Sequence, residues 1–421
     1  MRYEAYLGTS KKEIEDFYVG GKQVEELWDG DTLLWKKNGV KIRENVANFC
    51  GFSKSVSQNG AELLSVGYDG DVFDDTGSFL ELFTGEGTYT KRLVTCNDKE
   101  YCMAISLDNY FYAIKRKGIP SHQEQTITAF YKFGEDGNII YSFYNARAVP
   151  TDVLDESMTG WYLNYDNFYV INDTFYTIFE VGSHNSTPEK MANWFYIVAY
   201  KNGSCISQRL VDTGIKYGYN PMEALKCSNQ FRINGINILS GRVSYNTYHY
   251  CYPLVKVTEN TFSVLNSFYY TYIGTDRKYI YLTDTFGCND GRRKKLFSFD
   301  GENYKCIIDL DKIDIGTSNC DFVAAVRIED VLYAAVTYGD FHFCDHSYVI
   351  AIDEKEPKKS KIIYKLNASS KKKNAWAAIR QLTTKNGKLY VHKAWQKSWT
   401  DDKAKIGIDE ITFPSKKGDT K

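Results

Sequence analysis

The chain has few of the features that mark membrane spans, exported proteins and helical domains. Its 421 residues include only seven prolines and few runs of strong helix formers. No window reaches the roughly 18 uninterrupted apolar residues of a membrane-spanning helix. The N-terminus, MRYEAYLGTSKKEIEDF, has no apolar core of a secretory signal, so we expect no export by that route.

Charge and cysteine usage argue against a nucleic-acid-binding protein, a membrane-surface protein and a disulfide-stabilised protein. The 52 basic and 53 acidic residues leave a formal charge of −1, which gives no general attraction to nucleic acid or anionic membrane. The basic runs Arg292–Lys295 and Lys371–Lys373 are interpreted as solvated loops. None of the ten cysteines has CxxC spacing, so we expect thiols made in a reducing cytoplasm.

Sequence motifs for catalysis and cofactors are missing. The chain has no GxSxG elbow, HExxH helix, P-loop or dinucleotide-binding loop, so we expect no cofactor and no catalytic residue. Paired carboxylates for glycoside cleavage depend on a spatial separation that a sequence does not contain. The sequence therefore neither excludes a hydrolase nor contains a feature that indicates one.

Metal ligands are also sparse. His342, Cys344 and His346 would lie on one face of a strand, but steps of about 7 Å are too wide to close on one ion. The Asp-Gly-rich segments at 68–77 and 287–293 lack EF-hand spacing and are interpreted as ordinary turns. We expect no metal.

Aromatic residues are abundant, and they predict the fold class. With 34 Tyr, 24 Phe and 7 Trp, the chain favours pleated, half-buried surfaces. One sequence pattern recurs: a strand of alternating apolar residues, a turn that contains Gly or Asn, and a second strand. The clearest copy is Trp194–Val211, which turns at Asn202-Gly203. The copies begin near Phe79, Ile127, Trp194, Tyr252, Lys295, Tyr348 and Lys405, the last being truncated.

Each copy follows another strand signal, so the repeating unit is about four strands long. The intervals of 43 to 67 residues compare with roughly 40–50 for four-stranded propeller blades, or more with inserted loops. Radial stacking buries both apolar faces of each sheet. Seven units predict an all-β, seven-bladed propeller, with six or eight blades, a β-sandwich pair and a β-solenoid as alternatives. The Trp-Asp and Ser-x-Asp-x-Gly-x-Thr-Trp signatures do not recur.

Residues 1–45 lack the repeat and are predicted to be a separate attachment module. They read as three short strands that turn at Gly20-Gly21 and at Asp29-Gly30-Asp31. We expect the propeller over residues 46–415 and a polar tail over 416–421.

The module carries a short pattern, V-x-x-L-W-x-G-x-x-L-x-W. It consists of Val24, Leu27, Trp28, Gly30, Leu33 and Trp35. This stretch of about 25 of the 421 residues resembles adaptor segments in tail and baseplate proteins of phages and prophages of Gram-positive bacteria. Bacteriocin particles derived from phage tails are related assemblies to which the resemblance also applies. The resemblance implies synthesis in the cytoplasm, assembly with other tail subunits into a multi-copy particle, and release by lysis.

So small a module buries too little to be robust alone. We expect its apolar residues to dock onto a neighbouring tail subunit; the alternative is that they pack on the propeller or fill the core of the hairpin. The docking residues are Val24, Leu27, Trp28, Leu33, Leu34 and Trp35.

Surface aromatics are the expected contacts for a host cell-surface glycan, since sugar rings stack on such faces. The candidates are Trp376, Trp395, Trp399 and Tyr248, and the alternative is packing between blades. The leading hypothesis is a non-enzymatic tail or baseplate component that displays a propeller. A glycan-cleaving depolymerase and a stand-alone interaction propeller are the other two hypotheses.

Overall fold

The structure is a computed structural model, and the described residues fall almost entirely in strands and their tight turns. Side chains are described for most of these residues from residue 57 onward, and for none before it. The described residues are 17–19, 22–24, 26–29, 32–36, 41–48, 54–66, 79–84, 91–97, 100–117, 126–144, 148–150, 152, 161–183, 194–212, 226–246, 249–251, 254–266, 270–284, 294–313, 320–338, 346–367, 376–396 and 405–413.

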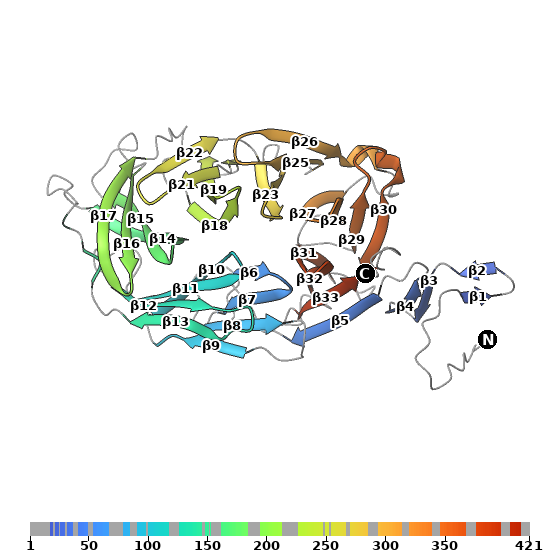
Figure 1. The fold of residues 1–421 in the computed structure, drawn as a ribbon, viewed down its shortest axis with the longest axis horizontal. Helices are drawn as coiled ribbons and strands as arrows, with labels where there is room; N and C mark the ends of the chain where they lie inside the picture. The colour runs from blue at the N-terminus through green and yellow to red at the C-terminus, as the bar shows by residue number, and fades with distance from the viewer. Residues whose placement is uncertain are drawn as a thin grey trace, which may run out of the picture.

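Seven four-stranded antiparallel sheets follow one another around a ring, which confirms the seven-bladed propeller (Figure 1). Blade 1 comprises β6 (Lys54–Gln58), β7 (Ala61–Val66), β8 (Phe79–Thr84) and β9 (Lys91–Thr95). Blade 2 comprises β10 (Glu100–Leu107), β11 (Tyr110–Lys117), β12 (Thr126–Phe133) and β13 (Ile139–Tyr144). Blade 3 comprises β14 (Trp161–Ile171), β15 (Thr174–Ser183), β16 (Trp194–Lys201) and β17 (Ser204–Asp212).

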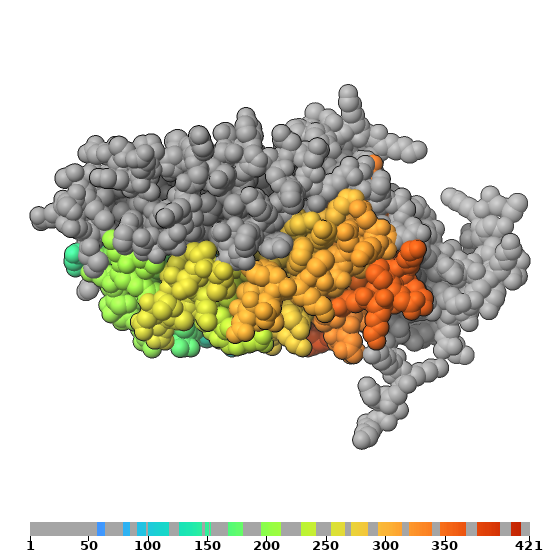
Figure 2. All heavy atoms as spheres, turned by 90° about the horizontal axis from the view of Figure 1, so that it is seen from above, coloured from blue at the N-terminus to red at the C-terminus, as the bar shows by residue number. Residues whose placement is uncertain are grey.

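Blades 4 to 6 follow the same strand order, and blade 4 has a short extra strand, β20, paired with β19. Blade 4 consists of β18 (Lys226–Ile233), β19 (Ile236–Asn246), β20 (His249–Cys251), β21 (Leu254–Val257) and β22 (Phe262–Asn266). Blade 5 consists of β23 (Tyr270–Thr275), β24 (Ile280–Asp284), β25 (Lys295–Phe299) and β26 (Tyr304–Asp309). Blade 6 consists of β27 (Cys320–Ile328), β28 (Val331–Tyr338), β29 (His346–Ile352) and β30 (Lys361–Asn367). Blades 3 to 6 lie side by side along one rim in chain order (Figure 2).

Blade 7 joins the two ends of the propeller. Its first three strands are β31 (Trp376–Lys385), β32 (Lys388–Gln396) and β33 (Lys405–Thr412), and its fourth is β5 (Lys41–Asn48) from the start of the chain. The truncated last repeat is explained, because the missing strand is supplied by residues before blade 1. β5 spans the boundary that we expected at residue 45, and its pairing with β33 makes it part of the propeller.

The N-terminal segment forms two hairpins rather than the expected run of three strands. β1 (Phe17–Val19) pairs with β2 (Lys22–Val24), and β3 (Glu26–Asp29) pairs with β4 (Thr32–Lys36), in separate sheets. A two-stranded ribbon twists strongly, which disfavours one strand serving both hairpins. Both hairpins lie outside the ring, on the side where β5 enters it (Figure 1).

Alternation along each strand sends neighbouring side chains to opposite blades. On β32, Leu389 and Val391 pack toward blade 6, while Tyr390 and Ala394 pack toward blade 1. The described core consists of seven apolar clusters, one at each interface between successive blades. The stacked sheets therefore hide their apolar faces against one another, as the repeat predicted.

Helical structure is minimal in the described part of the chain. It consists of two 3-10 turns of three residues each, η2 (Leu310–Lys312) and η3 (Pro357–Lys359). Neither is long enough to cross a membrane, and no other described segment is such a helix.

Candidate functional site

The first two strands of a blade are joined by a very tight turn in most of the blades. In five of these turns both central residues have positive φ, the backbone of the primed two-residue turns that favour Asn, Asp and Gly. The five pairs are Asn59-Gly60, Asp108-Asn109, Asn172-Asp173, Asn234-Gly235 and Asn386-Gly387. Because the first strand of each blade is the innermost, these turns gather around the axis at one end of the ring.

A cavity of about 450 Å³ opens at this end of the ring, and we call it the axial pocket. Six blades contribute to its wall, blade 3 being the exception, and hydroxyl, amide and charged side chains predominate. The lining residues are Ser57, Gln58, Asn59, Ser106, Leu107, Asp108, Asn109, Glu135, Gln230, Phe231, Arg232, Tyr272, Thr275, Asp276, Arg277, Val326, Arg327, Gln381, Leu382, Thr383, Thr384, Lys385 and Asn386.

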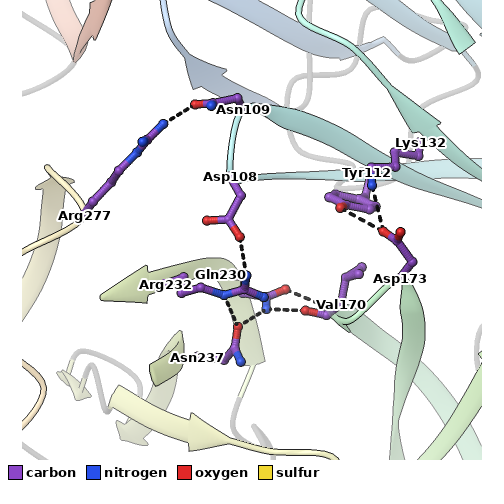
Figure 3. A network of polar contacts seen from close by, with 10 residues as sticks. All are labelled: Asp108, Asn109, Tyr112, Lys132, Val170, Asp173, Gln230, Arg232, Asn237 and Arg277. Atoms are coloured by element: carbon purple, nitrogen blue, oxygen red, sulfur yellow. Dashed lines mark hydrogen bonds and ion pairs between the residues drawn. The ribbon is translucent and has the colours of Figure 1, made fainter. Parts of the chain in front are cut away.

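Two of the contacts that cross the pocket between blades that are not neighbours are drawn in Figure 3. Asp108 of blade 2 forms an ion pair with Arg232 of blade 4, at 2.6 Å. Arg277 of blade 5 donates to the Oδ1 atom of Asn109 of blade 2. These contacts tie three blades together at the axis and fix the side chains of the pocket wall relative to one another.

Further contacts hold the wall next to blade 3. The Gln230 amide bridges the backbone of Val170, donating to its carbonyl and accepting from its N–H, both at 2.7 Å. Asp173 accepts from Lys132 at 2.8 Å and from the Tyr112 hydroxyl at 3.2 Å (Figure 3). Burial, and then the nearby Asp173 charge, raise the pKa of Tyr112 well above its usual value, so this phenol stays protonated and donates.

The charged groups of the pocket are unevenly satisfied. Its four cationic residues face three carboxylates. Glu135 accepts from Asn59 and Lys385, and Asp276 accepts from the Tyr281 hydroxyl and two backbone N–H groups. With Asp108 engaged by Arg232, Arg277 is left without an ion pair to any described carboxylate. The fourth cation, Arg327, pairs with Glu354 outside the lining, so Arg277 and Asp276 are the two charged groups of the pocket without a described ion pair.

One buried hydrogen-bond donor in the pocket wall is also unsatisfied. The Nε2 atom of Gln58 is buried and has no partner among the described residues. A buried amide without a partner costs free energy, roughly 1–3 kcal/mol. Because this nitrogen is covered, a ligand acceptor would reach it only if the Gln58 side chain turned toward the pocket.

A second polar group lies behind the pocket, at the interface where blade 7 meets blade 1. The Gly60 N–H donates to Thr383 Oγ1 at 3.0 Å, and Thr383 Oγ1 lies 2.9 Å from His392 Nε2. His392 Nδ1 lies 3.4 Å from Glu62 Oε2, and Glu62 also pairs with Arg380. Glu62 and His392 are fully buried.

The order of hydroxyl, imidazole and carboxylate is that of a hydrolytic triad, but the chemistry differs. Burial, and then the Arg380 charge, lower the pKa of His392 to about 3, which makes it a very weak base near neutral pH. Thr383 Oγ1 is already engaged by the Gly60 N–H. The group acts as a hydrogen-bonded clasp between the first and last blades.

Two of the four predicted glycan-stacking residues, Trp376 and Trp395, belong to the opposite end of the ring from the axial pocket. Trp376 starts β31 and Trp395 ends β32, and their pairing places both at that end. The Trp395 ring is half-buried, with Lys393 Nζ 5.4 Å from its centroid. The Trp376 side chain, Trp399 and Tyr248 lie outside the described residues, so a shared glycan site of the four stays a prediction.

The other predicted residues have mixed outcomes. The docking residues Val24, Leu27, Trp28, Leu33, Leu34 and Trp35 all lie in β2, β3 or β4, with Leu27 opposite Trp35, but their side chains are outside the described set. His342 and Cys344 lie outside it, as do residues 68–77, 287–293 and 416–421. The His346 ring stacks on Tyr338. Within the described ranges, no group of three His, Cys, Asp or Glu side chains is arranged to hold a metal.

Sequence reasoning missed both the axial pocket and the clasp. The signal for the pocket was the set of Asn-Gly, Asp-Asn and Asn-Asp pairs between the first two strand signals of the blades. The clasp had no such signal, because Glu62 and His392 are 330 residues apart.

Comparisons with known proteins give only distant structural similarities. No family model and no curated protein matches the chain. A prolyl endopeptidase structure is similar over 89% of this chain and 50% of its own, with 12% identity and a TM-score of 0.44. The β-propeller domain of the Trilobed protease from Pyrococcus furiosus covers 84% and 93%, with 9% identity and a TM-score of 0.40. Trypanosoma rangeli sialidase with the inhibitor DANA covers 77% and 56%, with 11% identity and a TM-score of 0.37. This chain thus spans half of the prolyl endopeptidase that it matches.

Proposed function

We propose that the chain is a non-enzymatic component of a phage-type tail or baseplate. It docks onto a neighbouring subunit through the two N-terminal hairpins and binds a host cell-surface glycan in the axial pocket. The observation that carries the binding role is the pocket itself, which collects polar side chains from six blades around about 450 Å³.

The lining of the axial pocket suits a sugar. Glycan hydroxyls need donors and acceptors at fixed positions, and the pocket supplies amides, hydroxyls and guanidinium groups. The braces from Asp108 to Arg232 and from Arg277 to Asn109 hold these groups in place. The pocket thus replaces the surface tryptophans as the proposed glycan site.

A binding role is favoured over cleavage by the state of the carboxylates. Asp108, Glu135 and Asp276 are each held by a described cation, hydroxyl or amide. Glycoside cleavage needs one carboxyl that stays protonated to donate and one free to act as base or nucleophile.

The docking role rests on the position of the hairpins and on their resemblance to tail adaptors. Both hairpins lie outside the ring, so a neighbouring subunit reaches them without disturbing the blades (Figure 1). Two paired two-stranded sheets are marginal on their own. A second surface that covers Leu27, Trp28 and Trp35 would stabilise them.

Replacing the gene in a producing strain tests the docking role. One variant lacks residues 1–36, which removes both hairpins and keeps β5. Particles are purified by sedimentation, and the chain is quantified in them by immunoblot. We expect the full chain in the particle and the shortened chain in the soluble fraction, folded and with its pocket intact.

Matched substitutions separate docking from loss of fold. Trp28→Ala and Trp35→Ala should each lower incorporation, whereas Lys305→Ala on the outer strand β26 should not. Equal incorporation of the shortened and full chains would contradict docking through the hairpins. The absence of any particle in the producing strain would instead favour a stand-alone interaction propeller.

A further inference from the structure

Two cysteine thiols meet where the chain passes from blade 1 to blade 2. Cys96 follows β9, and Cys102 lies on β10. Their sulfur atoms are 2.7 Å apart, and both side chains are essentially buried in the apolar cluster between these blades. The contact lies far from the axial pocket wall, and the proposed function does not use it.

Hydrogen bonds join Asn97 and Glu100, which lie between the two cysteines. The Glu100 N–H donates to the Asn97 carbonyl at 3.0 Å, and the Asn97 N–H donates to the Glu100 carboxylate at 2.8 Å. Lys115 pairs with the same carboxylate at 3.2 Å. Burial alone would raise the pKa of Glu100, but these contacts outweigh it and lower that pKa. These contacts hold Asn97, next to Cys96, close to Glu100, two residues before Cys102.

We propose that Cys96 and Cys102 are an oxidation site, at which the folded chain forms an intramolecular disulfide once it meets a small-molecule disulfide oxidant. The thiolate of one cysteine attacks the S–S bond of the oxidant and releases one thiolate, which takes up a proton. The second cysteine then attacks the mixed disulfide and releases the other half of the oxidant. Two electrons and two protons pass from the cysteines, and the oxidant becomes two thiols.

The surroundings determine how fast this reaction runs. The contact with Cys96, and then burial, raise the pKa of Cys102, and thiols rather than thiolates react slowly. Both sulfurs are covered by the blade interface, so the oxidant reaches them when that interface opens. The site therefore oxidises slowly, and once formed its disulfide is protected from reductants in the same way.

The disulfide would close a loop of seven residues, Cys96 to Cys102, at the crossover. Cross-linking restricts the unfolded chain and stabilises the folded one. We expect the oxidised chain to unfold at higher urea concentration than the reduced chain.

Tryptic mapping of the full chain tests this assignment. Lys99 lies between the two cysteines, so trypsin separates Leu93–Lys99 from Glu100–Lys115. The reduced protein is incubated with glutathione disulfide at a urea concentration just below its unfolding transition, and remaining thiols are alkylated after denaturation. We expect the two peptides joined, with loss of two hydrogens, and separated again by a reductant.

Variants and controls complete the test. Cys102→Ala and Cys102→Ser should abolish the joined peptide, whereas Cys205→Ser, which removes an exposed cysteine, should leave it unchanged. The wild-type measurement does not depend on whether these variants fold. Recovery of Cys96 and Cys102 in alkylated form after oxidation, or joined to other cysteines or to glutathione, would overturn the proposal.

Discussion

Ile42 pairs with Ile411 although the two residues lie at opposite ends of the chain. Their strands run antiparallel from Lys41 opposite Thr412 to Asn48 opposite Lys405. The ring is therefore closed by backbone hydrogen bonds rather than by the chain itself. Since β4 ends at Lys36 and β5 begins at Lys41, the proposed docking hairpins and the closing strand are almost adjacent.

Two deletions that differ by nine residues should differ strongly in their effect on stability. Removing residues 1–36 leaves the closing strand whole, so the urea midpoint of the propeller should change little. Removing residues 1–45 takes away most of β5 and exposes the edge of β33, an unpaired strand that promotes aggregation. We expect a large drop in the midpoint or an insoluble protein. Equal midpoints for the two deletions would show that β5 does not close the ring.

Gly274 should tolerate no side chain. It lies at a bulge in β23, and a Cβ atom there would be 1.8 Å from the carbonyl oxygen of Ala325 in blade 6. Because a backbone atom does not move aside easily, Gly274→Ala should destabilise by roughly 1–3 kcal/mol or more. Gly235→Asn is the matched control, since space around Gly235 is open and Asn accepts its positive φ. Chemical denaturation of both variants gives the comparison, and similar losses would contradict the close approach of blades 5 and 6.

His392 should make the stability of the fold depend on pH between about pH 7 and 5.5, above the pH range in which carboxylates titrate. The folded chain keeps His392 neutral to about pH 3, whereas the unfolded chain protonates it near pH ~6.5. Its contribution is therefore complete above about pH 6.5 and is lost as the pH falls, by up to ~1.4 kcal/mol per unit. His392→Gln should be less stable at pH 7.5 but show a flatter profile between pH 7 and 5.5. Parallel profiles for the two proteins would mean that His392 is accessible or charged in the fold.

Much of the architecture could be predicted from the sequence, because it follows from local patterns. The alternation of apolar residues recurs along the chain, usually with a turn like that at Asn202-Gly203, so the four-stranded unit and the number of units were visible. The closing role of β5 was not visible, because its partner β33 lies some 360 residues away and both are ordinary strands. The break between β2 and β3 depends on ribbon twist, which composition does not encode.

The candidate site was harder to predict, for a physical reason. Residues such as Asp108, Arg232 and Arg277 are ordinary turn and strand-end residues in the sequence. They become a site only because the ring brings the innermost turns to one axis, where Asp108 and Arg232 meet across the pocket. Aromatic residues drew attention to Trp376 and Trp395 instead, at the other end of the same strands.

Arg277 should matter for the ligand and little for the fold. It is exposed, reaches into the axial pocket and makes no ion pair with a described carboxylate. Hydrogen bonds from a charged donor are worth about 1.5–3 kcal/mol, so Arg277→Ala should weaken glycan binding by roughly 10- to 100-fold. Its urea midpoint should stay close to that of the wild type, and Lys256→Ala, an exposed charge on blade 4, should leave binding unchanged.

Binding and turnover measured on one polysaccharide sample test the central claim most directly. Purified Gram-positive cell-wall polysaccharide is incubated with the chain lacking residues 1–36, with its Arg277→Ala variant and with its Lys256→Ala variant. Bound protein is measured by co-sedimentation, and the size of the polysaccharide is measured by gel filtration. The account predicts saturable binding that Arg277→Ala loses and Lys256→Ala keeps, with the polysaccharide unchanged in size. Shortened polysaccharide, or binding that Arg277→Ala leaves intact, would contradict it.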